Sequence, residues 1–435
     1  MILSVMHISP QSWDLKSSLE YPDGGAGVDI PLGIDVPAVE ERCRNNCYEW
    51  LPKMYDADEA AFYGYYDPRY DDFSDPQTAN LIAPWQLMAA WDRYGDDEML
   101  ERAAASASWL DENMVDSHPM SLVLGGIQDN IKEHQVWTKY TGDFVVTNLG
   151  LFQRTGDEEH LQRAIQSGKF LLQALRHDFA PLYDRWNEVW LHRGWQSFGR
   201  TIGALLGLWE VTEVSDWLDW ALEWGDYALD LQSESGCFHL INQQYYSSDI
   251  AADEIRSLVL LTEHTEDDRF LDAAVGFADW HLQCQRDDGS WYVAMDRHDV
   301  PVSQYVGPGD VPNIGIALLR MFDLTRDVKY LVSTISAMRY SLSKQVLPDD
   351  EHPYQGNENL DWGFWSWDPC YDHTVSPDQS THHVRGLWFF IDYWLSLDEE
   401  TRDEAIEALP DDLPEVTPGC CGCGQRGVSE TPIGE

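Results

Sequence analysis

Four short segments together supply aromatic, acidic, basic and amide side chains directly before apolar stretches with helical spacing. Three of them span residues 134–143, 190–200 and 245–249, and the fourth spans 362–368 and continues through 378–383. Flat amphipathic rings stack on the apolar face of sugars, while short polar side chains bind sugar hydroxyls. An arginine fork binds a carboxylate through two hydrogen bonds. This mixture is typical of carbohydrate-binding sites, and Arg193 or Arg200 would suit an acidic sugar.

Asp143 is the candidate general acid/base. Such a carboxyl needs a raised pKa, which hydrophobic surroundings from Trp137 and Tyr140 would supply. A second proton-transfer group would come from the neighbouring segments: His192, Asp249 or Tyr246. In an ordinary glycosidase two carboxylates flank the bond that breaks, which makes Asp143 and Asp249 the pair to test. Their separation would indicate inversion or retention of configuration.

The predicted substrate-binding residues are aromatic or basic and lie near the starts of these helical stretches. They are Trp137, Arg193, Trp195, Arg200, Tyr246, Trp365 and His383. Each has an ordinary structural alternative, because aspartates often cap helices and tryptophans often pack in cores. No HxxxH or HExxH spacing occurs. Cys420, Cys421 and Cys423 crowd the tail without paired CxxC spacing. We therefore predict neither a metal nor a cofactor.

A repeat positions these segments: an apolar helical stretch, a short acidic turn, and a second helix. In five of the six copies a leucine opens the second helix, and the intervals between these leucines are 61, 57, 53 and 60 residues. The leucines are Leu100, Leu161, Leu218, Leu271 and Leu331. Such a period suits one helical hairpin and a connecting loop. A hairpin cannot bury its apolar face alone and must pack on its neighbours.

Six hairpins can close into a ring, so the predicted fold is an all-α (α/α)6 toroid. A helical bundle and an open solenoid are the alternatives. In a toroid the first helices of the hairpins run parallel and begin at one rim, where helix N-termini favour anions. The four segments would meet at this rim.

The chain divides into three predicted parts. Residues 1–76 form an N-terminal arm with one helix at about 36–54 that packs on the toroid. Residues 77–410 form the catalytic toroid, with hairpins at 78–114, 141–175, 197–231, 250–284, 312–346 and 381–409. Residues 411–435 lose the hydrophobic period and form a flexible tail that contains cysteines and glycines.

The formal net charge of −48 limits the possible partners. The chain has 20 Trp, 20 Tyr and 14 Phe, so it folds despite this charge. Self-repulsion of this size is relieved at molar salt, where the Debye length is about 3 Å. We therefore expect a salt-adapted, haloarchaeal protein. No basic stripe is available for nucleic acid, and no segment is apolar enough to span a membrane. No targeting segment is visible, so the expected location is cytoplasmic.

Several of these motifs resemble those of the six-hairpin glycosidases. The acid at Asp143, the apolar run after it and the Thr-Gly-Asp turn at 155–157 are similar to the arrangement in unsaturated glucuronyl and rhamnogalacturonyl hydrolases. Residues 192–195 are similar to the Arg-Gly segment of that family but lack its Asn-Gly, and residues 246–249 resemble its Ser-Ser segment. A haloarchaeal member that acts on hexuronic acids in protein N-glycosylation is also similar. The resemblance implies a sugar hydrolase with Asp143 as its acid.

These observations predict an enzyme that acts on a hexuronic acid, free or lipid-linked. In the reaction implied by the resemblance, Asp143 would protonate a double bond of the sugar and then activate water. In an epimerase, a base would remove the C5 proton and a second group would return it from the other face. A sugar-binding or scaffold module without catalysis is the alternative function. A terpene-type toroid is disfavoured because Asp-rich metal motifs are missing. The oligomeric state is not predicted.

Overall fold

The computed structural model describes residues 30–117, 121–128, 134–242, 244–369 and 373–410. The predicted tail at 411–435, with its three cysteines, lies outside the described residues, as do the first 29 residues of the predicted arm.

Pairs of consecutive helices make up most of this part of the chain. Their bounds are α2 (Ala79–Tyr94) and α3 (Asp97–Asn113), α4 (Thr138–Thr155) and α5 (Glu158–Arg176), α6 (Phe198–Thr212) and α7 (Ser215–Leu231), α8 (Ser248–Thr265) and α9 (Asp268–Cys284), α10 (Asp310–Thr325) and α11 (Val328–Ser343), and α12 (Pro377–Ser396) and α13 (Glu399–Glu407). The hairpin bounds predicted from the sequence agree with these to within about four residues.

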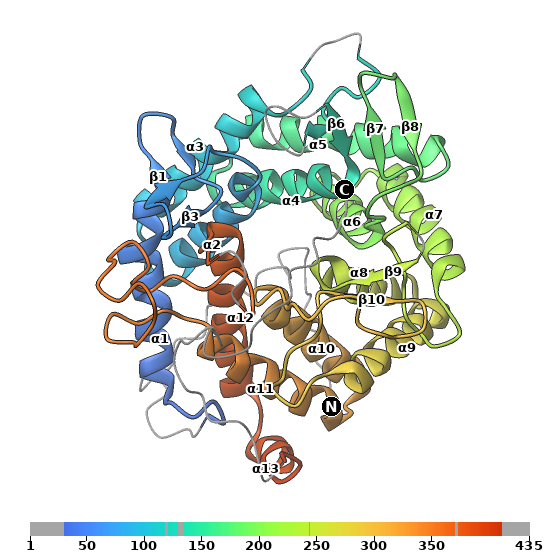
Figure 1. Cartoon of the computed structure of the whole chain (residues 1–435). Helices are drawn as coiled ribbons and strands as arrows, with labels where there is room; N and C mark the ends of the chain where they lie inside the picture. Colours follow the sequence, from blue (N-terminus) through green and yellow to red (C-terminus); the bar gives the residue numbers. More distant parts are fainter. Residues whose placement is uncertain (1–29, 118–120, 129–133, 243, 370–372, 411–435) are drawn as a thin grey trace.

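The first helices of the pairs form a closed inner ring (Figure 1). Each contacts the next in the order α2, α4, α6, α8, α10 and α12, and α12 contacts α2. The second helices of the first five pairs pack outside their partners. The predicted all-α (α/α)6 toroid is therefore confirmed. Because α4 and α10 are three places apart in this order, they face each other across the ring.

The recurring acidic turn has a simple local cause. The first helix ends at a residue in the left-handed conformation, which is Gly95 (φ 69°) in the first hairpin and Gly156 (φ 70°) in the second. The residue that follows it directly then caps the second helix, as Asp96 does by accepting from the backbone N–H of Glu98. Glycine adopts a positive φ without strain, and aspartate is a preferred N-cap. The repeated sequence is thus a repeated pair of helix caps.

The outer position beside α12 is taken by a helix from the start of the described chain. Helix α1 (Val36–Asn45) packs against α12, whereas α13 contacts α11. A π-helical segment, η2 (Asn46–Trp50), and a 3₁₀ turn, η3 (Leu51–Met54), continue α1. The helix predicted at about 36–54 thus exists in three geometries. The domain boundaries predicted from the sequence stay predictions.

Arg93 of α2 links the two ends of the ring. Its Nε donates to Glu40 of α1 at 2.7 Å, and its Nη1 donates to both carboxylate oxygens of Asp392 of α12 at 3.1 Å. The hydroxyl of Tyr94 also donates to Glu40, at 2.7 Å. The guanidinium therefore joins three helices where the first hairpin meets the last.

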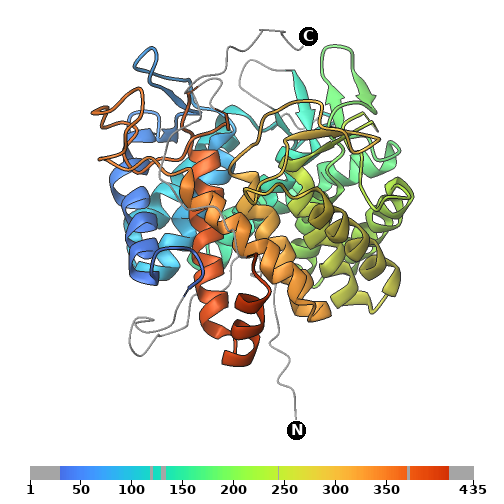
Figure 2. The ribbon, with the colours of Figure 1, turned by 60° about the horizontal axis from the view of Figure 1, so that its bottom comes forward.

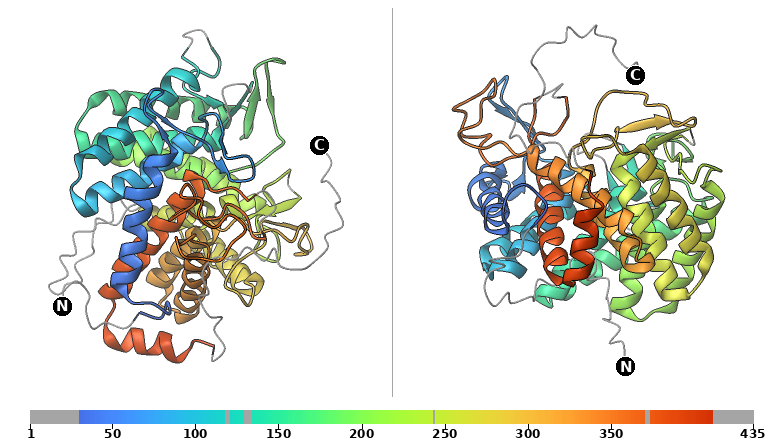
Figure 3. Two further views of the ribbon diagram at one scale, coloured as in Figure 1. Left: turned by 60° about the vertical axis from the view of Figure 1, so that its left-hand side comes forward. Right: turned by 90° about the horizontal axis from the view of Figure 1, so that it is seen from below.

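Short strands and long loops gather at one end of the helical ring (Figures 2 and 3). The strands are β1 (Tyr55–Asp56), β2 (Ala61–Phe62), β3 (Tyr66–Asp67), β4 (Asp72–Phe73), β5 (Ile127–Gln128), β6 (Gln135–Trp137), β7 (Leu182–Asp184), β8 (Val189–Leu191), β9 (Tyr245–Ser247) and β10 (Ala294–Asp296). Strands β5 to β8 form a four-stranded antiparallel sheet, and β9 pairs with β10. Strand β6 leads directly into α4, and β9 leads directly into α8. None of the helices in the described part is both long and apolar enough to cross a membrane.

We predict that Arg93→Met lowers the free energy of unfolding by about 3 kcal/mol, because it leaves Asp392 and Glu40 without the guanidinium that links them. Urea unfolding followed by circular dichroism measures the change. Arg269→Met is the matched control, since Arg269 pairs with Asp226 and Asp267 on the exposed surface and no measurable change is expected there. Equal, small effects of both substitutions would contradict the role of Arg93.

Candidate active site

A cavity of about 400 Å³ lies at the end of the ring where the inner helices begin. Every inner helix contributes to its wall, through residues such as Ala79 of α2, Asp143 of α4, Arg200 of α6, Asp310 of α10 and Asp378 of α12. Further lining residues are aromatic: Tyr65, Tyr140, Trp195 and Trp367. The cavity thus combines apolar rings with carboxylates at helix N-termini, where the backbone favours negative charge.

Arg200 is the charged centre of the cavity floor. Its Nη1 donates to Asp143 Oδ2 at 2.8 Å, its Nη2 to Asp249 Oδ1 at 3.1 Å, and its Nε to Asp253 Oδ2 at 2.9 Å. The Nη2 also donates to the backbone carbonyl of Asp249, at 3.0 Å. Since a guanidinium stays charged in proteins, one cation from α6 binds three aspartates from α4 and α8.

Two glycines allow this arrangement because they let the helices approach closely. A Cβ on Gly142 would lie 2.8 Å from the carbonyl oxygen of Arg200, and a Cβ on Gly199 would lie 2.4 Å from the backbone of Asp253. Neither distance is possible for a real side chain. The glycine that precedes each of Asp143 and Arg200 therefore brings α4, α6 and α8 together at this level.

Lys139 is the second cation in the wall. Its ammonium donates to Asp249 Oδ2 at 2.6 Å and lies 4.1 Å from the ring centre of Trp195 and 4.9 Å from that of Tyr140. The side chain is only 4% exposed. Asp249 is therefore held by Lys139 on one oxygen and by Arg200 on the other.

The environment separates the protonation of two neighbouring carboxyls. Burial raises the pKa of Asp143 to about 7, against the opposing charge of Arg200. Desolvation acts on Asp249 in the same direction, but Lys139 and Arg200 outweigh it and hold the pKa of Asp249 well below its usual value. At neutral pH, Asp143 can carry a proton while Asp249 is ionised. Carboxyls whose pKa values are pushed apart in this way are typical of acid/base pairs.

Another carboxyl able to hold a proton lies at the start of α10. Burial, together with the charge of Asp249, raises the pKa of Asp310 to about 8, although a hydrogen bond from the Ser248 hydroxyl opposes the shift. Because α10 lies opposite α4 in the ring, Asp310 and Asp143 come from opposite walls of the cavity.

On α12, Asp378 has the reverse shift. Desolvation would raise its pKa, but His382 outweighs that effect and holds the pKa below the usual value. The Nε2 of His382 lies 3.5 Å from Asp378 Oδ1. The other ring nitrogen, Nδ1, lies 2.7 Å from the amide nitrogen of Asn313. If the amide donates to Nδ1, the Nε2 carries the proton that faces Asp378.

Four of the predicted site residues line the cavity: Asp143, Asp249, Trp195 and Arg200. Trp137 packs behind them, with its ring centre 5.9 Å from that of Trp195. His192 and Arg193 are exposed on the chain that follows β8, and they are not among the lining residues.

The remaining three predicted residues are buried beside the cavity and are not among its lining residues. The Tyr246 hydroxyl lies 3.1 Å from Nε2 of His281. His383 stacks on Phe364 with ring centres 4.2 Å apart and lies within hydrogen-bond distance of Ser341. Trp365 is 1% exposed, and its sequence neighbours on the C-terminal side, 366 and 367, line the cavity instead. The roles assigned to all these residues stay predictions.

Sequence reasoning did not assign a role to four charged residues of the site, namely Lys139, Asp253, Asp310 and Asp378. All four lie within the first two turns of an inner helix. A signal was present for Asp310, which follows the turn-forming segment Gly-Pro-Gly at 307–309 and opens a helix as Asp249 nearly does. Asp253 could have been found from its spacing, since it lies one turn after Asp249 on the same helix face.

Comparison with known proteins supports the fold. No protein-family model matches the sequence, and no curated protein matches it significantly. Solved structures do match: a cellobiose 2-epimerase from Bacillus thermoamylovorans B4167 is 14% identical with a TM-score of 0.64, covering 80% of this chain and 98% of that one. A D-mannose isomerase is 11% identical with a TM-score of 0.62, covering 84% and 99%. An unsaturated glucuronyl hydrolase specific for heparin is 12% identical with a TM-score of 0.60, covering 82% and 98%. The chain therefore shares the six-hairpin fold of these proteins.

The raised pKa of Asp143 predicts how stability depends on pH. In the unfolded chain this carboxyl ionises near pH 4, whereas the folded protein holds the proton until about pH 7. The stability that the protonated group contributes is complete below about pH 4 and is lost as the pH rises through about 7. We predict that Asp143→Asn gains stability relative to the wild type over this window, by a few kcal/mol in total, and that the difference is constant above it. Urea unfolding at a series of pH values measures it.

Asp184→Asn on β7 is the control for this experiment. Hydrogen bonds from Asn187 hold the pKa of Asp184 below its usual value. Its contribution is therefore present above about pH 4 and is lost only as the pH falls further. The stability difference between Asp184→Asn and the wild type should be constant between about pH 5 and 8. Parallel curves for the wild type and Asp143→Asn would contradict the raised pKa of Asp143.

Proposed function

We propose that this protein is a carbohydrate-active enzyme in which Asp143 transfers protons as general acid and base. One observation supports this proposal most directly. The guanidinium of Arg200 contacts two cavity carboxyls, and the pKa is raised for Asp143 and lowered for Asp249. A cavity of about 400 Å³ is in the range of small-ligand sites. Its aromatic rings offer stacking surfaces for a sugar.

The proposed substrate is a hexuronic acid. Lys139 supports it, because an ammonium has three donors and the described contacts use one of them, for Asp249. A uronate carboxylate could accept from another, beside the rings of Tyr140 and Trp195. Asp143 and Asp310 carry no charge while they hold their protons, so among the aspartates that line the cavity Lys139 and Arg200 would face the charges of Asp249 and Asp378. This reduces the repulsion that a bound carboxylate would meet.

Two reactions fit the carboxyls, and each has its own supporting observation. Hydrolysis of an unsaturated uronyl sugar is favoured by the neighbouring acid and base, Asp143 and Asp249: Asp143 would protonate the double bond and then help to activate water. Epimerisation or isomerisation is favoured by Asp310, which can carry a proton on the wall opposite Asp143. One group would then remove a proton and the other would return one from the other face. The structural neighbours named above include proteins of both reaction types.

A role in protein N-glycosylation, on a free or lipid-linked glycan in the cytoplasm of a salt-adapted cell, extends this proposal. The net charge of −48 supports the choice of molar KCl for every assay. The alternative, a sugar-binding module without catalysis, has the same aromatic rings but needs no acid with a raised pKa.

We predict that Asp143→Asn lowers kcat by at least about 100-fold, since general acid/base catalysis contributes about 10² to 10⁴, and changes sugar binding by no more than a few-fold. The assay follows loss of ultraviolet absorbance from 4,5-unsaturated uronyl disaccharides, and separately the nuclear magnetic resonance signals of saturated uronic acids in D₂O. Asp310→Asn discriminates the reactions, because it should abolish epimerisation and leave hydrolysis largely intact. Binding of uronic acids without turnover by the wild type would favour the sugar-binding module.

We also predict that Lys139→Met raises KM for a uronic acid by about 10- to 100-fold, which corresponds to one hydrogen bond to a charged group. The matching neutral hexose, which has no carboxylate, should show little change in KM. An equal rise for both sugars would show that Lys139 acts through Asp249 and not through the substrate, and it would contradict the proposed acidic substrate.

A further inference from the structure

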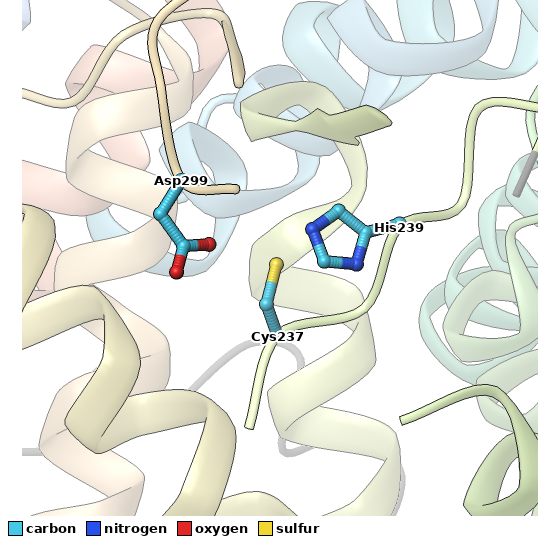
Figure 4. Close-up of side chains that lie close together, drawn as sticks. All are labelled: Cys237, His239 and Asp299. Atoms are coloured by element: carbon cyan, nitrogen blue, oxygen red, sulfur yellow. The ribbon is translucent and has the colours of Figure 1, made fainter. Parts of the chain in front are cut away.

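A cluster of side chains that could bind a metal ion is separate from the residues that line the cavity (Figure 4). Cys237 and His239 come from the connection between α7 and β9, and Asp299 comes from the turn that follows β10. The sulfur of Cys237 lies between the His239 ring and the Asp299 carboxylate. One ligand atom from each residue lies within 4.8 Å of those of the other two.

Two features of these side chains are those of metal ligands. The Nε2 of His239 is shielded from solvent and has no hydrogen-bond partner among the described residues. A buried polar atom without a partner is costly, and a bound cation would satisfy it. The other feature is at Asp299, where the indole N–H of Trp280 donates to Oδ1 at 2.9 Å and leaves Oδ2 available. Ligand carboxylates are commonly oriented by a hydrogen bond of this kind.

The backbone holds both segments firmly. The backbone N–H of Ser233 donates to the carbonyl of Cys237 at 2.9 Å, and the neighbouring Phe238 packs against Phe198 and Phe277. The second segment is a turn in which the N–H of Asp299 donates to the carbonyl of Asp296 at 3.0 Å. Asp299 adopts a positive φ of 61°, a conformation that aspartate tolerates better than most residues. The two ligand segments are therefore fixed before any metal binds.

We propose that Cys237, His239 and Asp299 bind a divalent transition-metal ion, of which Zn²⁺ fits best. Thiolate, imidazole and carboxylate are the three protein ligands that zinc prefers. In a tetrahedral zinc site with bonds of about 2.0–2.3 Å, ligand atoms are about 3.3–3.8 Å apart. Side-chain rotations that move the ligand atoms by about 1 Å bring the three atoms to that spacing. A water molecule takes the fourth position. On binding, the Cys237 thiol releases its proton to solvent as the sulfur–metal bond forms.

The location indicates what the ion does. Strand β10 pairs with β9, with Met295 opposite Tyr246. Strand β9 ends at Ser247, which lines the sugar cavity and lies two residues before Asp249. An ion that joins residues 237–239 to the turn after β10 fixes the strand pair that leads into α8. Its role is structural, and it does not depend on the proposed reaction.

The test uses Co²⁺ as a spectroscopic probe for Zn²⁺ on the full chain, after removal of metal with a chelator. We expect one Co²⁺ per chain, with a sulfur-to-cobalt charge-transfer band that Zn²⁺ abolishes on competition. Because Cys420, Cys421 and Cys423 are also thiols, every variant is made both in the unaltered chain and with these three changed to serine. A band that requires the tail cysteines but not Cys237 would overturn the proposal, as would the absence of any binding.

Three substitutions assign the ligands. Cys237→Ser should abolish the charge-transfer band, while Cys284→Ser, which changes a nearby thiol outside the cluster, should keep it. Asp299→Asn is the substitution least expected to disturb folding. Residue 299 is solvent accessible, and the oxygen of the new amide can still accept the hydrogen bond from Trp280. This substitution should weaken Co²⁺ binding by on the order of 100-fold, as expected for the loss of one ligand among three. The thermal midpoint of the wild type should rise with Zn²⁺ up to one equivalent, and a rise of equal size in Asp299→Asn would contradict the site.

Discussion

The guanidinium of Arg200 is the contact on which the rest of the candidate site depends. It binds three aspartates, from α4 and α8, at 2.8–3.1 Å, and the side chains of Arg200, Asp143 and Asp253 are no more than 10% exposed. Without this cation, Asp143, Asp249 and Asp253 would repel one another at short range, and no charge from α6 would oppose the desolvation of Asp143 and Asp249. With it, and with Lys139 on Asp249, one carboxyl keeps its proton near neutral pH and its neighbour does not. The difference in charge follows from the number of cations on each carboxyl.

The toroid makes this arrangement possible. A closed ring of inner helices gathers six helix starts at one rim, so residues far apart in the sequence share one cavity. The close approach of α4, α6 and α8 is set by Gly142 and Gly199, where a side chain would collide with the next helix. The ring itself is joined between its first and last hairpins by Arg93. In both places an arginine joins neighbouring helices by binding their carboxylates. Removing the arginine would take this positive charge away from those carboxylates.

The sequence predicts the helices well because their signals are local. The recurrent turn combines a left-handed residue with an aspartate cap, and both preferences act within a few residues. The site is predicted less completely. Asp143, Asp249 and Arg200 are found because they start apolar helical stretches. The hydrogen bonds from Arg200 to the two aspartates, however, depend on the packing of helices that are far apart in the sequence, across 57 residues for Asp143 and 49 for Asp249. Asp310 is not identified as a site residue because a single aspartate does not stand out in a sequence with 76 acidic residues. The sequence does not tell which face of a strand or helix meets the cavity, so it cannot predict that Tyr246 and His383 lie beside the cavity and not on its wall.

The site depends on Asp143 keeping its proton up to about pH 7, where Asp249 is already ionised. Infrared difference spectra of protein labelled with carbon-13 aspartate, recorded across about pH 5 to 9, report protonated carboxyls directly. We expect a protonated-carboxyl band that disappears as the pH rises, with a midpoint near the pKa of about 7. This band should be absent from Asp143→Asn. If Asp143→Asn removes no band that titrates above about pH 5, Asp143 is ionised over the whole pH range recorded. That result would contradict the raised pKa of Asp143 and its role as a general acid.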